Sequence, residues 1–112
     1  MKKKILLNIV KNYFKFFQSK DIFKLEDLFS KRIVLEDWNN FKKGKNSVIN
    51  FNKNLFKKFK NIKISLKKIV FINDFKLICF ISIKLDKQKL KVIDILEFNR
   101  KLKIKKIEAY LG

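Results

Sequence analysis

The chain has 112 residues, a length that suits one domain with a single core. Hydrophobic residues make up 47% of it, so it can fold although 35% of its residues are charged, because disorder requires low hydrophobicity together with high charge. The absence of His and the single Cys exclude His-based triads and the usual zinc sites. The two glycines, Gly44 and Gly112, form no phosphate-binding loop. We expect one domain over residues 1–112 and no cofactor.

The net charge of +19 raises the question of a nucleic-acid partner. Only Arg32 and Arg100 are Arg among the 29 basic residues, whereas base-edge and bidentate phosphate recognition favours Arg. The lysines are also spread over every segment of the chain. Two explanations stay open: a Lys-rich codon bias that fills tolerant surface positions, or a basic patch for an acidic partner. We expect salt-sensitive adhesion to polyanions and no specific nucleic acid.

The sequence contains no clear targeting signal. Cys79 lies in the apolar run of residues 77–81, which is typical of a small core residue. Lys2–Lys4 followed by Ile5–Leu7 looks like the start of a signal peptide, but polar residues soon interrupt it and no small-residue cleavage site follows. No apolar run reaches the length of a transmembrane helix. These observations predict a cytoplasmic protein without a membrane partner.

The first half of the chain has helical periodicity. Apolar residues recur every three or four positions over residues 5–17, which predicts an amphipathic helix. A second helix should follow, with Ser19 or Asp21 as its cap. Its apolar residues are Phe23, Leu25, Leu28 and Phe29. A third helix is predicted over residues 47–59, with Gly44 as the turn residue ahead of it.

Strand patterns occupy most of the remaining sequence. Residues 32–37 are typical of a strand, and from Ile62 onward apolar and polar residues alternate with a period of two. Further strands are expected over residues 76–85, 90–98 and 102–111, with turns at residues 73–74, 86–88 and 99–101. Helices followed by a run of antiparallel strands indicate an α+β fold, in which the helices pack on one face of a curved sheet.

Several of these strands are apolar on both faces. Val92, Leu96 and Phe98 share one face of their strand, and Ile93 and Ile95 share the other. Helices can cover only one face of the sheet, so the outer face needs another partner. We expect a homodimer that packs through this outer face.

Three polar side chains are directed inward by their apolar neighbours. Asp94 has two apolar residues on each side within residues 92–96, and burial favours a neutral or paired carboxyl group. Tyr13 lies in the apolar stripe of the first helix. Asp37 ends the strand 32–37 on the side of Ile33 and Leu35, where it should be better solvated. Helices over a curved sheet would bring the three groups to a common cavity.

The order of these features resembles the nuclear transport factor 2-like superfamily, in its SnoaL-like and ketosteroid isomerase-like branch. The similarity covers nearly the whole chain, although each motif is weak alone. The matching stretches are residues 13–14, 21–25, 28–30, 33–37, 43–45, 92–98 and 103–110. The resemblance implies a single SnoaL-like domain, with three N-terminal helices forming a cone on a strongly curved antiparallel sheet, a cystatin-like α+β barrel.

The resemblance also implies roles for the three inward polar residues. Ketosteroid isomerases use a Tyr in the first helix, an Asp ending the first strand and an Asp in a late strand, which match Tyr13, Asp37 and Asp94. Asp37 would be the general base that moves a proton between carbons of a ketone. Tyr13 and a protonated Asp94 would donate hydrogen bonds to the enolate oxygen. The implied function is binding of a small hydrophobic carbonyl compound, with cofactor-free isomerase activity.

The chain departs from this family at two points. Trp38 stands where the family usually has Pro, and it could narrow the cavity mouth; the additional tyrosines that often support the oxyanion donors are absent. The side chains expected to bind substrate are Trp38, Phe17, Phe56 and Leu96. Alternatives stay open: Asp94 could be a structural contact and Asp37 a turn residue, and the protein could be a ligand carrier or a dimeric adaptor. Nucleic-acid binding is a third alternative.

Overall fold

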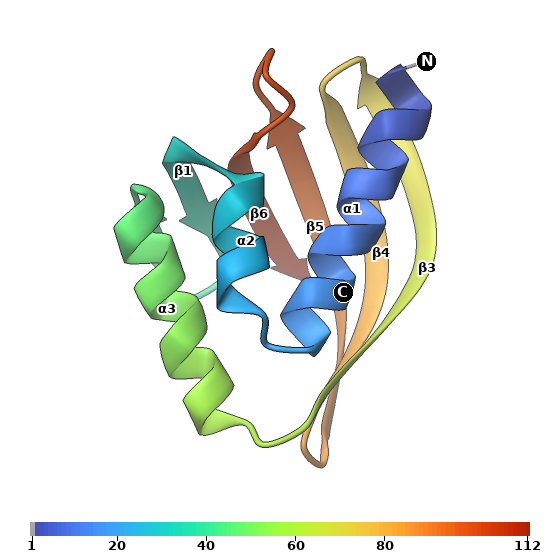
Figure 1. Ribbon diagram of the computed structural model, residues 1–112. Coiled ribbons are helices and arrows are strands. Elements are labelled where there is room, and N and C mark those ends of the chain that lie inside the picture. Colours follow the sequence, from blue (N-terminus) through green and yellow to red (C-terminus); the bar gives the residue numbers. More distant parts are fainter. Residues whose placement is uncertain (1) are drawn as a thin grey trace.

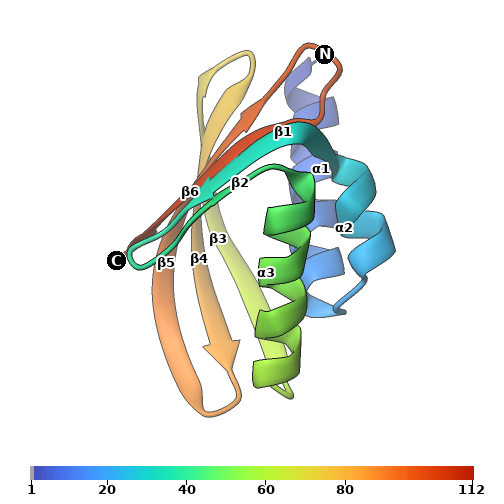
Figure 2. The same ribbon diagram turned by 90° about the vertical axis from the view of Figure 1, so that its left-hand side faces the viewer.

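The computed structural model describes residues 2–112, which form three helices and a six-stranded sheet. The helices are α1 (Lys2–Gln18), α2 (Ile22–Leu28) and α3 (Lys45–Lys58). The strands are β1 (Phe29–Glu36), β2 (Phe41–Lys43), β3 (Ile62–Asn73), β4 (Lys76–Leu85), β5 (Gln88–Phe98) and β6 (Ile104–Leu111). All three helices lie on one face of the curved sheet (Figures 1 and 2). This arrangement confirms the predicted α+β fold class.

The sheet has the order β2-β1-β6-β5-β4-β3 and is mixed rather than wholly antiparallel. Strands β3 to β6 pair antiparallel in sequence, as predicted, whereas β1 pairs parallel with β6. The sheet stays open, with β2 and β3 at its edges. The three-residue strand β2 is too short for a sequence pattern to reveal. It pairs antiparallel with β1 across the turn of residues 37–40.

The helix boundaries follow local chemistry. The Asp21 side chain accepts a hydrogen bond from the Lys24 backbone amide at 3.1 Å, so Asp21 rather than Ser19 caps α2. Phe29, expected in this helix, is instead the first residue of β1. Gly44 has a φ of +93° at the start of α3, a conformation that favours glycine.

Strand β3 keeps its apolar side inward by means of a register shift. Ile64 and Leu66 face the helices, and the pairing with β4 then slips by one residue between Leu66 and Lys68. After the shift the inward positions are Ile69 and Phe71, which pack against the core. Such a bulge bends the strand and increases its twist, which helps the sheet curve around the helices.

Polar contacts hold the helices at the end of the molecule where α1 and α3 finish. The Lys20 ammonium group donates to the backbone carbonyls of Phe56, Phe59 and Lys60 at 3.0, 2.6 and 2.9 Å, and so ties the α1–α2 turn to the C-terminal end of α3. The Gln18 side chain accepts from the Ile64 backbone amide at 2.7 Å. These bonds fix the separation of α1, α3 and β3, between which the cavity lies. No helix within residues 2–112 is long and apolar enough to cross a membrane.

Candidate functional site

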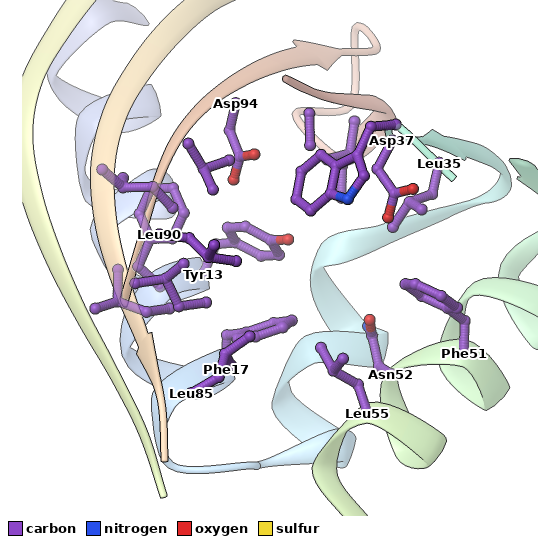
Figure 3. A pocket seen from close by; sticks show the side chains of 18 residues that line it. Tyr13, Phe17, Leu35, Asp37, Phe51, Asn52, Leu55, Leu85, Leu90 and Asp94 are labelled. Carbon is purple, nitrogen blue, oxygen red and sulfur yellow. The ribbon is translucent and has the colours of Figure 1, made fainter. Parts of the chain in front are cut away.

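A cavity of about 140 Å³ lies between the helices and the concave face of the sheet. Its wall consists mainly of Phe, Leu, Ile and Val side chains from α1, α3 and the strands (Figure 3). The lining side chains that carry a polar atom are Tyr13, Asp37, Trp38, Asn52 and Asp94. The structure therefore brings the three inward polar residues identified from the sequence to one apolar cavity.

Asp94 lies on β5 with its side chain directed into the cavity (Figure 3). It is 7% exposed, and its carboxyl group has no hydrogen-bond or ion-pair partner within residues 2–112. Burial raises the pKa of Asp94 from 3.8 to about 7, and the negative charge of Asp37 adds to the rise. At pH values below 7 this group is therefore mainly a neutral acid that can donate a hydrogen bond.

The Tyr13 hydroxyl points into the same cavity from α1 (Figure 3). The ring packs against Phe14 and Phe29, with centroid distances of 5.0 and 6.2 Å, which fix its orientation. Burial, followed by the charge of Asp94, raises the pKa of Tyr13 well above its ordinary value. Tyr13 therefore stays protonated, and its hydroxyl has no partner within the described chain.

Asp37 follows directly after β1 and is held by the turn of residues 37–40. Its Oδ1 accepts hydrogen bonds from the backbone amides of Asn39 and Asn40 at 2.8 and 2.7 Å, and the Asn40 side-chain amide lies 3.1 Å from the same oxygen. The other oxygen, Oδ2, has only a longer contact of 3.3 Å with that amide. The turn thus orients the carboxylate and leaves Oδ2 as the oxygen that can accept a proton.

Trp38 lines both the cavity and a second, outer hollow of about 490 Å³. The side chain is 44% exposed. Asp37, Phe51 and Leu55 also line both spaces, so this group separates the interior from the surface. Polar residues such as Asn54, Lys58 and Gln88 line the outer hollow. Trp38 therefore lies between the cavity and the outer hollow.

Two of the four side chains expected to contact a substrate are placed differently. Phe17 and Trp38 line the cavity, but Phe56 and Leu96 lie outside its wall. The Phe56 ring is turned edge-on against Phe17 at a centroid distance of 5.0 Å, so Phe17 covers it. Leu96 is fully buried one inward position beyond Asp94 on β5, where it packs in the core. The apolar character of Phe56 and Leu96 does not by itself distinguish a cavity-wall residue from a core residue.

Asn52 is a site residue that the sequence analysis missed. It is 2% exposed on α3, and its side-chain Nδ2 has no acceptor within residues 2–112. An unpaired buried amide of this kind costs about 1–3 kcal/mol. The signal was its spacing, because Asn52 stands four residues from both Val48 and Phe56 in the buried stripe of the helix.

Ala109 provides the space beside Asp94. It pairs directly with Asp94 across β5 and β6 and lines the cavity. It is the single alanine of the chain, and its methyl group fills little of the volume next to the carboxyl group.

Within residues 2–112 no three acidic, Cys or His side chains gather in a way that could hold a metal ion.

The cavity volume limits what the interior can hold. Drug-sized ligands occupy pockets of roughly 300–1,000 Å³, whereas an apolar cavity of about 150 Å³ takes a molecule of the size of benzene. At about 140 Å³ the interior fits one ring rather than a fused ring system.

Comparison with solved structures places the fold. An NTF2-like protein of unknown function from Cytophaga hutchinsonii superposes with a TM-score of 0.81 at 10% identity, over 96% of this chain and 89% of the other. A candidate SnoaL-like polyketide cyclase from Shewanella denitrificans superposes with a TM-score of 0.83 at 12% identity, over 96% of this chain and 90% of the other. A candidate ketosteroid isomerase from Kribbella flavida superposes with a TM-score of 0.80 at 10% identity, over 94% of this chain and 76% of the other.

The sequence alone gives no comparable match. No protein-family model matches the chain, and no curated protein matches it. At identities of 10 to 12% the structural likeness establishes the fold and not the activity. The chain therefore has the nuclear transport factor 2-like fold, which it shares with SnoaL-like and ketosteroid isomerase-like proteins.

Proposed function

We propose that the cavity binds a small one-ring carbonyl compound and moves a proton at a carbon next to its carbonyl group. The observation that carries this proposal is the pair of unpartnered donors. Tyr13 and the neutral Asp94 both open onto an apolar cavity whose wall also includes the Asp37 carboxylate. Two donors and one base around an apolar cavity are the groups that enolisation of a ketone requires.

The proposed reaction uses these groups in fixed roles. Asp37 Oδ2 removes a proton from the carbon between the carbonyl group and a β,γ double bond. The electron pair moves into a dienolate, whose oxygen accepts hydrogen bonds from Tyr13 and protonated Asp94. Asp37 then returns the proton to the γ-carbon, which gives the conjugated ketone. No cofactor is consumed, and the protein ends in its starting protonation state.

The size of the interior supports a substrate smaller than the steroid in the name of the Kribbella flavida protein. That protein is longer than this chain, which covers 76% of it. A cavity of about 140 Å³ does not admit four fused rings. We therefore propose a monocyclic ketone, with the apolar ring against Phe17 and Leu55 and the carbonyl oxygen toward Tyr13.

The direct test is turnover of cyclohex-3-en-1-one, followed by the ultraviolet absorbance of the conjugated product. We expect a rate above that of buffer, and no turnover of a β,γ-unsaturated steroid ketone of four rings. Binding of the ketone without turnover, detected by a thermal shift, would instead support a ligand carrier. Neither binding nor turnover would support an adaptor with a closed site.

We also propose that the protein is a homodimer formed through the outer face of the sheet. The three helices lie on the opposite face of the sheet (Figure 2). The outer face carries apolar side chains that are half-buried or exposed. They are Val70, Ile72, Ile78, Phe80, Ile93, Ile95 and Tyr110. The register places Phe80, Ile93 and Tyr110 in one row across β4, β5 and β6, a continuous patch typical of an interface.

We expect light scattering at about 10 µM protein to give twice the chain mass of 13.6 kDa. Replacing Ile93 with Lys should give the monomer mass, because a charge buried at the centre of an apolar interface is costly. Replacing the exposed Lys57 of α3, on the helical side of the molecule, with Glu is the control and should leave the dimer intact. A monomer mass for the unaltered protein would overturn this assembly.

A further inference from the structure

Asn52 presents an acceptor to the cavity that the proposed proton transfer does not use. Its side chain is 2% exposed and extends from α3 toward the cavity (Figure 3). The Nδ2 atom is enclosed by the protein and has no acceptor among residues 2–112. The Oδ1 atom keeps accessible surface at the cavity, and no group of the described chain donates to it. The interior therefore meets Asn52 as an oxygen atom, which can only accept a hydrogen bond.

The fold does not require an amide at this position. The buried neighbours of Asn52 on α3 are Val48, Ile49 and Phe56, all apolar, and a leucine of similar volume would continue this stripe. The enclosed Nδ2 lowers stability relative to leucine, because a buried donor without an acceptor loses its bond to water. Local choices that oppose stability collect at functional sites, so the polarity of Asn52 is best explained by what the cavity holds.

The polar groups of the cavity wall differ in what they offer a ligand. Tyr13 and the neutral Asp94 are donors that project from α1 and β5, whereas the Asn52 oxygen is an acceptor that projects from α3 (Figure 3). A ligand with a carbonyl group alone satisfies the two donors and leaves the Asn52 oxygen against an apolar ring. A ring that also carries a hydroxyl group satisfies the donors and the acceptor.

Asp37 is the other acceptor in the cavity wall, and the proposed reaction already uses it. Its Oδ1 accepts from the backbone amides of Asn39 and Asn40 at 2.8 and 2.7 Å, and its Oδ2 is the proposed base. A ligand hydroxyl bound to Oδ2 would occupy the oxygen that must take the proton. The amide oxygen of Asn52 is not a base for a proton on carbon, so it can hold a hydroxyl group without competing with the proton transfer.

We propose that Asn52 is a specificity-determining residue whose Oδ1 accepts a hydrogen bond from a ligand hydroxyl group, so that the ligand is a monocyclic hydroxyketone. This inference rests on the proposed ligand site but not on proton transfer. The carbonyl oxygen of the ligand lies toward Tyr13 and Asp94, and its hydroxyl group lies toward α3.

The test compares three ketones of similar size that differ in the group opposite the carbonyl. In 4-hydroxycyclohexanone this group can donate, in cyclohexane-1,4-dione it can only accept, and in 4-methylcyclohexanone it does neither. Titrations followed in NMR spectra give the dissociation constants. Asn52→Leu should raise that of 4-hydroxycyclohexanone at least fivefold relative to 4-methylcyclohexanone, because only the hydroxyl group loses an acceptor. The dissociation constant of the dione should stay the same or fall relative to that of 4-methylcyclohexanone.

Two further variants make this ratio specific to the amide oxygen. Asn52→Ala removes the same oxygen without filling its space, so it should change the ratio in the same direction as Asn52→Leu. Asn50→Leu is the matched control, because Asn50 is exposed on α3 and lies outside the cavity wall. It should change none of the three dissociation constants.

The outcomes separate this inference from the proposed function. A selective fivefold weakening of the hydroxyketone supports it even if no turnover occurs. An equal change for all three ketones, or no change, overturns the role of Asn52 even if the protein turns over ketones. A selective weakening of the dione overturns the acceptor role, because the amide would then be a donor. Failure of all three ketones to bind the unaltered protein overturns the ligand site and this inference together.

Asp37→Asn distinguishes the two acceptors of the cavity wall. If Asn52 holds the hydroxyl group, this variant keeps the preference for 4-hydroxycyclohexanone that the Asn52 variants lose. A preference lost in Asp37→Asn and kept in the Asn52 variants would assign the hydroxyl group to Asp37 and overturn the inference.

A stability measurement guards against a purely structural role. Asn52→Leu removes an unpaired buried Nδ2, so its thermal midpoint should equal or exceed that of the unaltered protein. A lower midpoint together with an unselective loss of binding would assign Asn52 to the core and overturn the inference. If the leucine variant does not fold, Asn52→Ala carries the same test of selectivity.

Discussion

Replacing Asp37 with Asn is expected to lower kcat/KM for a β,γ-unsaturated cyclic ketone by about 10²–10⁴-fold. The amide cannot take a proton from carbon, whereas it keeps the Oδ1 acceptor for the backbone amides of Asn39 and Asn40. The turn of residues 37–40 should therefore persist, and ligand affinity should change little. Steady-state kinetics together with a binding titration separates the two quantities, because loss of the base affects the rate and not the affinity.

The matched control for this variant is Asp74→Asn, which removes an exposed carboxylate from the β3–β4 turn. It changes the net charge equally but lies outside the cavity wall, so its kinetics should match those of the unaltered protein. A second consequence concerns Asp94. Because the charge of Asp37 contributes to the raised pKa of Asp94, Asp37→Asn should lower that pKa. Equal turnover by the unaltered protein and the Asp37 variant would remove Asp37 as the base.

Much of the fold followed from sequence periodicity, and the limits of this prediction have physical causes. The alternation after Ile62 identified four antiparallel strands, because each has one face on the core. Periodicity does not encode which distant strands pair, so the parallel pairing of β1 with β6 was not predicted. The periodicity over residues 5–17 also does not fix which apolar residues of α1 are buried: Leu6, Val10 and Phe14 are buried, whereas Ile5 is 46% exposed.

The candidate site was predictable where a polar residue interrupts a strongly apolar pattern. Asp94 stands out in a run of apolar residues on β5, and Tyr13 stands out in an apolar helical stripe. Asn52 does not stand out in the same way, because α3 also contains Asn46, Asn50 and Asn54. Its spacing of four residues from Val48 and Phe56 is the one sequence signal that separates it from the exposed ones. The cavity volume depends on the joint packing of many side chains and has no local sequence signal.

Asp94 is expected to make the protein less stable as the pH rises from about 4 to 7. Burial raises the pKa of Asp94 from 3.8 to about 7, so the folded state holds the proton more tightly than the unfolded chain does. The contribution of this group to stability is complete below the unfolded pKa and is lost as the pH rises through the folded pKa. A shift of this size corresponds to about 4 kcal/mol of unfolding free energy.

The measurement is the difference in unfolding free energy between Asp94→Asn and the unaltered protein, from denaturant titrations between pH 4 and 8. Asparagine has nearly the same shape as the neutral acid and does not titrate, so the variant should gain relative stability as the pH rises and be the more stable protein at pH 8. Asp74→Asn should show no such trend. A flat difference for Asp94→Asn would mean that the pKa of Asp94 is not raised, so that the group is ionised above about pH 4 in the folded protein and is not a donor to an enolate. Conversely, if the stability trend is found, kcat/KM should fall above about pH 7, because the same deprotonation removes a hydrogen-bond donor from the oxyanion.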